Sequence, residues 1–462
     1  MNQQIEHFAL KSKRIVTHGT MKPGCVVVRN GVIVAIAKYD VTLPCPIEDV
    51  GDLVVMPGIV DTHVHINEPG RTEWEGFNTA TQAAAAGGIT TLVDMPLNCI
   101  PVTTTKAAFE EKLVAVKDKL WVDCGFWGGV IPQSIDQLPE LLDAGVLGVK
   151  SFLIDSGIEE FPAVTAKDIR KAMPILAEYD APYLIHAELD PAEAQGVSAQ
   201  PASIGDDYQS FLASRPKHWE NDAVELMVDL ASEVAQQGYQ PKVHIVHLSS
   251  AEALSSIAQA KEKGLKFTAE TCPHYLTLWS EDIPNGKTLF KCCPPIREND
   301  NRELLWQAVE KRQISFIVSD HSPCTPQLKH ISSGDIEKAW GGISALQFSL
   351  PLIWTEAQKR GLSLVNISEL MSYRTAKFAG LATIKGDIRV GFDADLVVFD
   401  DKAEYEISND LVKHRHKFTP YAGKTVCGNI ERTYVRGQLV YQQQQFGERP
   451  LGRPILKGRI RK

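Results

Sequence analysis

The feature that most constrains the fold is a repeated alternation of short apolar runs with helix-like segments. Between Met56 and about Gly380, eight apolar runs end in VDTHVHI, ITTLVDMP, VDCGFWGGV, LGVKSFL, APYLIHAE, VHIVHLSS, LKFTAET and ISFIVSD. The segments between them are rich in Ala, Glu, Lys and Leu, with apolar spacings of three and four that are typical of amphipathic helices. The alternation predicts an α/β fold, a (β/α)₈ TIM-like barrel. A doubly wound sheet is the weaker alternative, because no glycine-rich phosphate loop follows the first strand.

The two ends of the chain have a different, strand-rich pattern. Near the N-terminus, Asn30-Gly31 separates two β-branched runs, which is a strong hairpin signal. After Gly380, the segments GDIRVGFDADLVVFD and ERTYVRGQLVYQQQQF again indicate strands. We expect residues 1–55 and 381–462 to form one discontinuous β-rich domain, a small β-sandwich, that flanks a barrel of residues 56–380.

Composition excludes several classes of partner. The 462 residues include 57 acidic and 48 basic side chains, and we find no basic patch that would indicate nucleic-acid binding. No run is long and apolar enough for a membrane span, and the N-terminus lacks the apolar stretch of a signal peptide. The nine cysteines include no CxxC pair, which indicates a reducing compartment, so we expect a cytoplasmic protein.

Six polar residues lie at the ends of predicted strands, the edge where barrel enzymes place their active sites. They are His63, His65, Lys150, His186, His247 and Asp320. Strand side chains alternate, so the pattern His-x-His directs both imidazoles to one side, which suits two ligands of one metal. A single histidine at such a position is more often a hydrogen-bonded core residue, but six such residues together favour a shared site.

Lys150 lies in the otherwise apolar run LGVKSFL. Desolvation lowers the pKa of a buried lysine, and the neutral amine can add carbon dioxide to form a carbamate whose two oxygens bind two cations. The alternative is a lysine paired with an acid such as Asp155.

Four histidines, a carbamate and Asp320 have the number and softness of ligands that suit two divalent ions such as Zn²⁺. Two such ions can share one bridging hydroxide, which then acts as the nucleophile. Asp320 is expected to take the proton of this hydroxide as general base and to return it to a leaving nitrogen as general acid. The implied chemistry is hydrolysis of an amide-like bond.

The motifs GIVDTHVH, GVKSF, HAE, VHLSS and VSDHSP together resemble those of the cyclic amidohydrolases in the amidohydrolase superfamily. Within that group, HVHINEPGRTEWEGF, DMPLNCIPVTT, KCCPPIR and SDHSPC resemble the allantoinases. The resemblance implies a first zinc ion on His63, His65, carbamylated Lys150 and Asp320, and a second on Lys150, His186 and His247. It also implies ring opening of allantoin to allantoate in purine degradation, by a homotetramer.

The substrate can be argued from one position. Dihydroorotases typically have an arginine two residues past the second histidine, where it pairs with the substrate carboxylate, and this chain has Asn67 there. Because allantoin is neutral, an amide suits it better than a buried arginine. We name Asn98, Cys292 and Ser322 as further substrate contacts, since they follow the second, seventh and eighth strands. A turn or packing role is the alternative for each of them.

Three other functions stay open from the sequence. The chain could be a dihydroorotase, or a hydantoinase or dihydropyrimidinase, of the same superfamily. It could also be a non-catalytic relative, although such relatives have lost metal ligands and all six ligand positions are occupied here.

Overall fold

A computed structural model describes residues 7–17, 19–191 and 203–459. Its centre is a closed barrel of parallel strands, which confirms the (β/α)₈ prediction. The strands are β6 (Ile59–Val64), β7 (Ile89–Asp94), β8 (Asp123–Phe126) continued by β9 (Gly128–Gly129), β10 (Val149–Phe152), β11 (Pro182–His186), β12 (Lys242–Ile245), β13 (Lys266–Thr271) and β14 (Phe316–Ile317).

Backbone contacts between the first and last strand positions close the barrel. Val64 forms a parallel bridge with His321, and the amide of His65 donates to the carbonyl of His321 at 2.8 Å. At the third position, Trp127 separates β8 from β9, and its amide donates to the carbonyl of Asp94 at 2.9 Å. The doubly wound alternative is therefore wrong, because an open sheet has no contact between its first and last strands.

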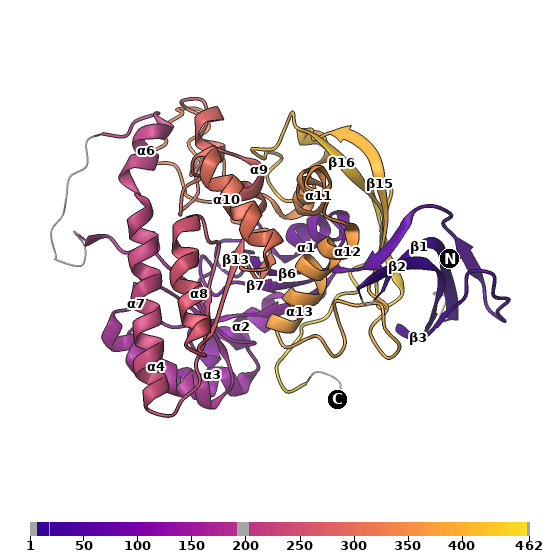
Figure 1. The fold of residues 1–462 in the computed structure, drawn as a ribbon, viewed down its shortest axis with the longest axis horizontal. Coiled ribbons are helices and arrows are strands. Elements are labelled where there is room, and N and C mark those ends of the chain that lie inside the picture. Colours follow the sequence, from indigo (N-terminus) through magenta and orange to yellow (C-terminus); the bar gives the residue numbers. More distant parts are fainter. Residues whose placement is uncertain (1–6, 18, 192–202, 460–462) are drawn as a thin grey trace.

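Helices surround the strands (Figure 1). The helix-like segments between the apolar runs include α1 (Phe77–Ala86), α2 (Lys106–Ala115), α4 (Ala166–Glu178), α7 (Lys217–Gln236), α8 (Leu254–Glu262) and α10 (Asn299–Glu310). Further helices are α3 (Leu138–Ala144), α6 (Tyr208–Ser214), α9 (Pro273–Thr277), α11 (Ser349–Lys359), α12 (Leu364–Ser368) and α13 (Arg374–Phe378). The turn Glu369–Tyr373 between α12 and α13 is π-helical.

The two ends of the chain meet in one nine-stranded sheet at the right of Figure 1. Its strands are β1 (His7–Thr17), β2 (Thr20–Arg29), β3 (Val32–Ala37), β4 (Ile47–Asp49), β5 (Val54–Pro57), β15 (Leu396–Glu406), β16 (Thr425–Val435), β17 (Gln438–Gln442) and β18 (Gln445–Phe446). β5 joins the two halves, since it pairs with β1 on one side and antiparallel with β15 on the other.

The predicted hairpin at Asn30-Gly31 is confirmed. Both residues have positive φ, 51° and 80°, and they connect the antiparallel strands β2 and β3. The division into domains at residues 55 and 381 stays a prediction. β5 crosses the first of these boundaries and leads through Gly58 directly into β6.

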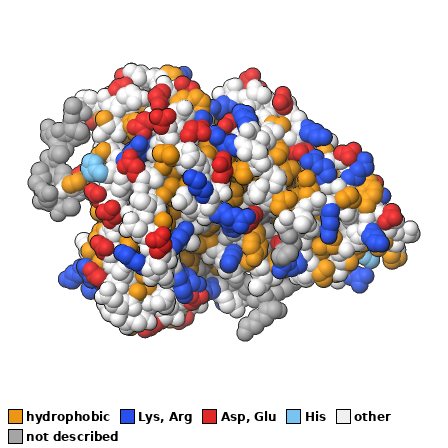
Figure 2. Space-filling view, viewed as in Figure 1, with side chains coloured by type: hydrophobic (Ala, Val, Ile, Leu, Met, Phe, Trp, Pro, Cys, Tyr) orange, Lys and Arg blue, Asp and Glu red, His pale blue; other side chains and the backbone are white. Residues whose placement is uncertain are grey.

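Acidic and basic side chains intermingle on the face of the molecule that Figure 2 shows. Within the described ranges, the helices include none with the length and apolar character that crossing a bilayer requires.

Candidate metal centre

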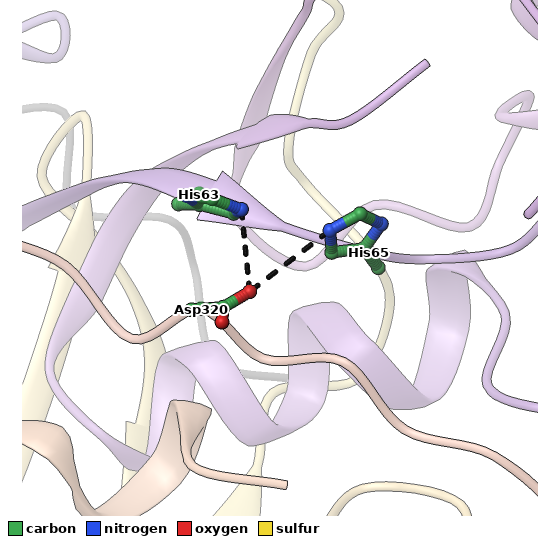
Figure 3. A group of neighbouring side chains, drawn as sticks. All are labelled: His63, His65 and Asp320. Carbon is green, nitrogen blue, oxygen red and sulfur yellow. Dashed lines mark ion pairs between the residues drawn. The ribbon is translucent and has the colours of Figure 1, made fainter. Parts of the chain in front are cut away.

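The six residues named from the sequence converge at the carboxyl ends of the barrel strands. His63 and His65 lie at the end of β6, with their ring centroids 5.5 Å apart. Both rings face Asp320, which follows β14 (Figure 3). The Nε2 atoms of His63 and His65 lie 3.2 and 3.9 Å from Oδ1 of Asp320. The predicted placement of both imidazoles on one side of the strand is what the structure has.

The remaining three residues complete the same cluster. Nζ of Lys150 lies 3.3 Å from Nε2 of His63. His186 ends β11, and its ring centroid lies 4.6 Å from the ring centroid of His247. The ring centroids of His247 and His63 are 5.4 Å apart. His247 and Asp320 both have positive φ, 39° and 45°. The backbone there turns sharply as the strand ends, and residues in this region are often functional.

Burial sets the protonation of these groups. It lowers the pKa of Lys150 to about 8 and raises that of Asp320 to about 8. It also lowers the pKa of His63, His65 and His247 well below the usual range. The imidazoles are therefore neutral and keep a lone pair for a cation.

The pairing of Lys150 with Asp155, the alternative raised by the sequence, is wrong. Asp155 is exposed and accepts a hydrogen bond from the amide of Gly157 at 3.0 Å. In the part of the chain that the structure describes, Lys150 forms no ion pair with it. The pKa of Lys150 responds to burial first, and then to the negative charges of Asp320 and Glu270.

Two glutamates orient the histidines, and sequence reasoning missed both. Glu270, in β13, bonds Nδ1 of His63 at 2.5 Å and Nε2 of His244 at 3.0 Å. Glu188, two residues after His186, bonds Nε2 of that ring at 2.9 Å. In each case one ring nitrogen donates to a carboxylate, which leaves the other free as a ligand. In the sequence, the one feature that marks either glutamate is its position as an acidic residue at the end of an apolar run.

Asp61, in β6, accepts hydrogen bonds from two backbone amides. Its carboxylate accepts from the backbone amide of His63 at 3.1 Å and from the amide of Ser319 at 3.1 Å. Asp61 therefore ties the backbone beside His63 to the segment that follows β14.

The residues present fit divalent cations. One donor atom each from His63, His65 and Asp320 lies within 4.8 Å of the others. Nδ1 of His247 is buried and has no hydrogen-bond partner in the described structure. A buried nitrogen without a partner costs free energy unless something binds it. Neutral imidazoles with carboxylate oxygen form a donor set that suits Zn²⁺ or a similar ion.

A cavity of about 400 Å³ opens onto this cluster. Of the four predicted substrate contacts, Asn98, Cys292 and Ser322 lie in its wall, and Asn67 is not among the lining residues. The side chain of Asn67 is buried and donates to the carbonyl of Pro323 at 3.2 Å. The cavity is also lined by residues that we did not predict, among them Arg215, Lys291 and Trp340.

The comparisons with known proteins agree with this geometry. Residues 54–440 match the model of the Amidohydrolase family. A protein of Streptomyces avermitilis named allantoinase is 46% identical over 96% of this chain and 97% of its own. One of Saccharomyces cerevisiae with the same name is 44% identical over 98% and 99%.

A solved structure has the same architecture. The L-hydantoinase (dihydropyrimidinase) from Arthrobacter aurescens is similar with a TM-score of 0.90 and 28% identity, over 97% of this chain and 99% of its own. Family match, near full-length similarity and a closed barrel with a histidine-rich site at its strand ends agree with one another. This chain belongs to the amidohydrolase family.

Proposed function

We propose that this chain hydrolyses the cyclic amide of allantoin to give allantoate. The observation that carries the proposal is the similarity to proteins named allantoinase over almost the whole length of both chains. The cluster of four histidines, Lys150 and Asp320 supports it, since it provides a complete ligand set in front of a cavity.

Each side chain has a proposed role. His63, His65, Asp320 and Lys150 as a carbamate would hold one Zn²⁺ ion, and Lys150, His186 and His247 would hold a second. Such ions, when bound, would lower the pKa of a water and polarise a carbonyl oxygen of the substrate. Burial lowers the pKa of Lys150, which keeps part of the amine neutral and able to add carbon dioxide.

Asp320 is the proposed general base and acid. Its Oδ1 faces His63 and His65, so Oδ2 is the oxygen that can hold the proton of the attacking water. The same oxygen would then return that proton to the ring nitrogen as the amide bond breaks.

Neutral groups are the proposed substrate contacts. Asn98, Cys292 and Ser322 lie in the cavity wall, and an amide with a hydroxyl suits a ureide that both donates and accepts hydrogen bonds. Asn67 would not touch the substrate. Its hydrogen bond to the carbonyl of Pro323 would instead hold the loop beside Ser322 in place. The structural similarity to an L-hydantoinase favours hydantoins as the second candidate substrate.

A substrate panel on zinc-loaded and metal-free protein tests the proposal. We expect about two ions per chain, and turnover of allantoin far above that of dihydroorotate, hydantoin and dihydrouracil. If dihydroorotate is the best substrate, the inference that Asn67 in place of an arginine excludes a substrate with a carboxylate is wrong. Full activity in metal-free protein would contradict the ligand assignment, and a protein with neither metal nor turnover would be a non-catalytic relative.

We further propose a homotetramer that works in the cytoplasm. The nine cysteines are all unpaired in the structure, which suits a reducing compartment. Analytical ultracentrifugation of the purified protein tests the subunit count, since a monomer at micromolar concentration would contradict the tetramer.

A further inference from the structure

We infer that residues 215–220, which run from the end of α6 through the first turn of α7, position His186 and His247 and so set the affinity for the second metal ion separately from the first. The inference rests on the proposed function, because it assigns those two histidines to one ion. The segment acts through two arms: Arg215 holds Glu188 against His186, and Glu220 holds the backbone that follows His247.

The first arm is a buried chain of ionic hydrogen bonds. Nε2 of His186 donates to Oε2 of Glu188 at 2.9 Å, and the guanidinium of Arg215 donates to both oxygens of the same carboxylate at 3.2 and 2.8 Å. Glu188 is fully buried.

The first arm fixes both the orientation and the tautomer of His186. Because Arg215 holds both oxygens of Glu188 in place, Oε2 accepts the Nε2 proton of His186 and leaves the lone pair of the ring on Nδ1. The ring is also stacked on Phe152, with centroids 4.3 Å apart and planes inclined by 13°. Rotation of the imidazole away from a metal would therefore break an ionic hydrogen bond.

The second arm holds the backbone that carries His247. Glu220, in the first turn of α7, accepts from the amides of Ser249 and Ser250, both at 2.7 Å. These amides follow His247, whose φ of 39° is unfavourable for a residue with a Cβ. Asn301 adds a bond to the carbonyl of Ser249 at 2.8 Å. Glu220 thus helps to stabilise the turn that orients the ring of His247.

Arg297 joins the two arms. Its Nη1 donates to the carbonyl of Arg215 at 3.1 Å, and its Nη2 lies 3.8 Å from Oε2 of Glu220. The groups proposed for the first ion depend on other partners, since His63 is held by Glu270 and His65 lies against Asn98. Loosening the segment 215–220 should therefore affect one ion and leave the other unchanged.

The test compares Glu188→Gln with Glu233→Gln. The first substitution keeps the shape of the side chain but removes its charge, whereas Glu233 lies on the exposed side of α7 and pairs with Arg170 at 2.6 Å. Each protein is dialysed against buffers of graded free Zn²⁺, and bound metal is measured by elemental analysis. Loss of such an outer carboxylate typically weakens metal binding about 10- to 100-fold. We expect that loss for the second ion of Glu188→Gln, an unchanged first ion, and wild-type binding by Glu233→Gln.

Two results would overturn the inference: both ions bound by Glu188→Gln as in wild type, or both weakened equally. If Glu188→Gln does not fold, as judged by circular dichroism of the metal-free protein, Glu220→Gln serves instead. The side-chain amide of that variant has one acceptor oxygen for two backbone amides, and the same selective loss is expected. Wild-type protein that binds no zinc would contradict the proposed function itself, which keeps the two failures distinguishable.

Discussion

Lys150 is the residue that both proposed ions would share. Its ammonium is almost fully buried among four histidines and has no carboxylate at hydrogen-bond distance in the described structure. A charged lysine there would repel cations, whereas a carbamate would attract two of them. In the proposed ligand set, the residue that looks least like a metal ligand in the sequence is therefore the one that both ions would share.

Lys150→Ala is expected to lose both ions. Removing the shared anion should lower kcat/KM for allantoin by about a thousandfold or more, since metal polarisation contributes several kcal/mol to catalysis. Elemental analysis and steady-state kinetics measure the two effects. Added bicarbonate should not restore this variant, whereas it should raise the metal content of wild-type protein purified without it. Wild-type metal content in Lys150→Ala would show that the carbamate is not needed.

Asp320→Asn separates metal binding from proton transfer. The amide keeps an oxygen toward His63 and His65, but it cannot take a proton. We expect about one half or more of the bound metal to remain while kcat falls about 100- to 10,000-fold, the range of a lost general base. Kinetics and metal analysis on the same sample check this. If kcat falls only in proportion to metal content, Asp320 is a ligand and not the base.

At the scale of the elements, the buried side chain of Lys329 connects two loops of the cavity wall, one with Lys291 and one with Trp340 and Gly342. Nζ of Lys329 donates to the carbonyls of Lys291, Trp340 and Gly342 at 2.9, 2.8 and 2.5 Å. All three acceptors belong to residues that line the cavity. Burial lowers the pKa of Lys329 to about 8, and the three carbonyls satisfy all of the protons of the ammonium.

Lys329→Met should therefore loosen the wall without touching the metal ligands. We expect kcat/KM to fall about 10- to 100-fold, the typical cost of misplacing a substrate by about 1 Å, with both ions still bound. Lys287→Met, at an exposed position in the same region, is the matched control and should behave as wild type. Unchanged kinetics of Lys329→Met would mean that the loops hold their shape without the ammonium.

The same scale shows why the barrel could be predicted and some helices could not. The eight strands are short apolar runs ended by polar residues, and their period is visible in the sequence alone. Helix α3 carries a proline near its start and ends at Gly145, whose φ is 116°, but its seven residues are too few to show a helical period. Helices α11 to α13 follow a long connection after β14, outside the regular alternation.

The predicted ligands could be named because each lies on a barrel strand or just past its end, so that topology alone brings them together. Their supporting residues could not, because partner choice depends on three-dimensional contacts. Glu270 and Asp61 are both acids on barrel strands, yet only Glu270 reaches the ring of His63. The orientation of Asn67 toward Pro323, and not toward the cavity, likewise follows from its turn, where φ is 67°.

At the scale of the whole molecule, a buried ionic cluster connects the barrel to the nine-stranded sheet. Nζ of Lys385 lies 2.6 Å from Asp123, in barrel strand β8, and 3.0 and 2.7 Å from Asp393 and Asp395, which precede β15. Arg436, which follows β16, also pairs with Asp123. Three acids could suggest a cation site, but the lysine ammonium already lies among them.

Lys385→Met is expected to destabilise the protein by about 3–5 kcal/mol, because it leaves buried carboxylates without their counter-charge. Burial raises the pKa of Asp395 even with the lysine present. Without the ammonium that carboxyl should stay protonated to still higher pH, so the variant should lose more stability as the pH rises. Urea unfolding of the two proteins at pH 6 and pH 8 measures both effects.

Lys359→Met, in an exposed pair with Glu356, is the control and should change stability by no more than about 0.5 kcal/mol. A Lys385→Met protein that unfolds with wild-type stability at both pH values would show that the barrel and the sheet are held together by their apolar contacts alone.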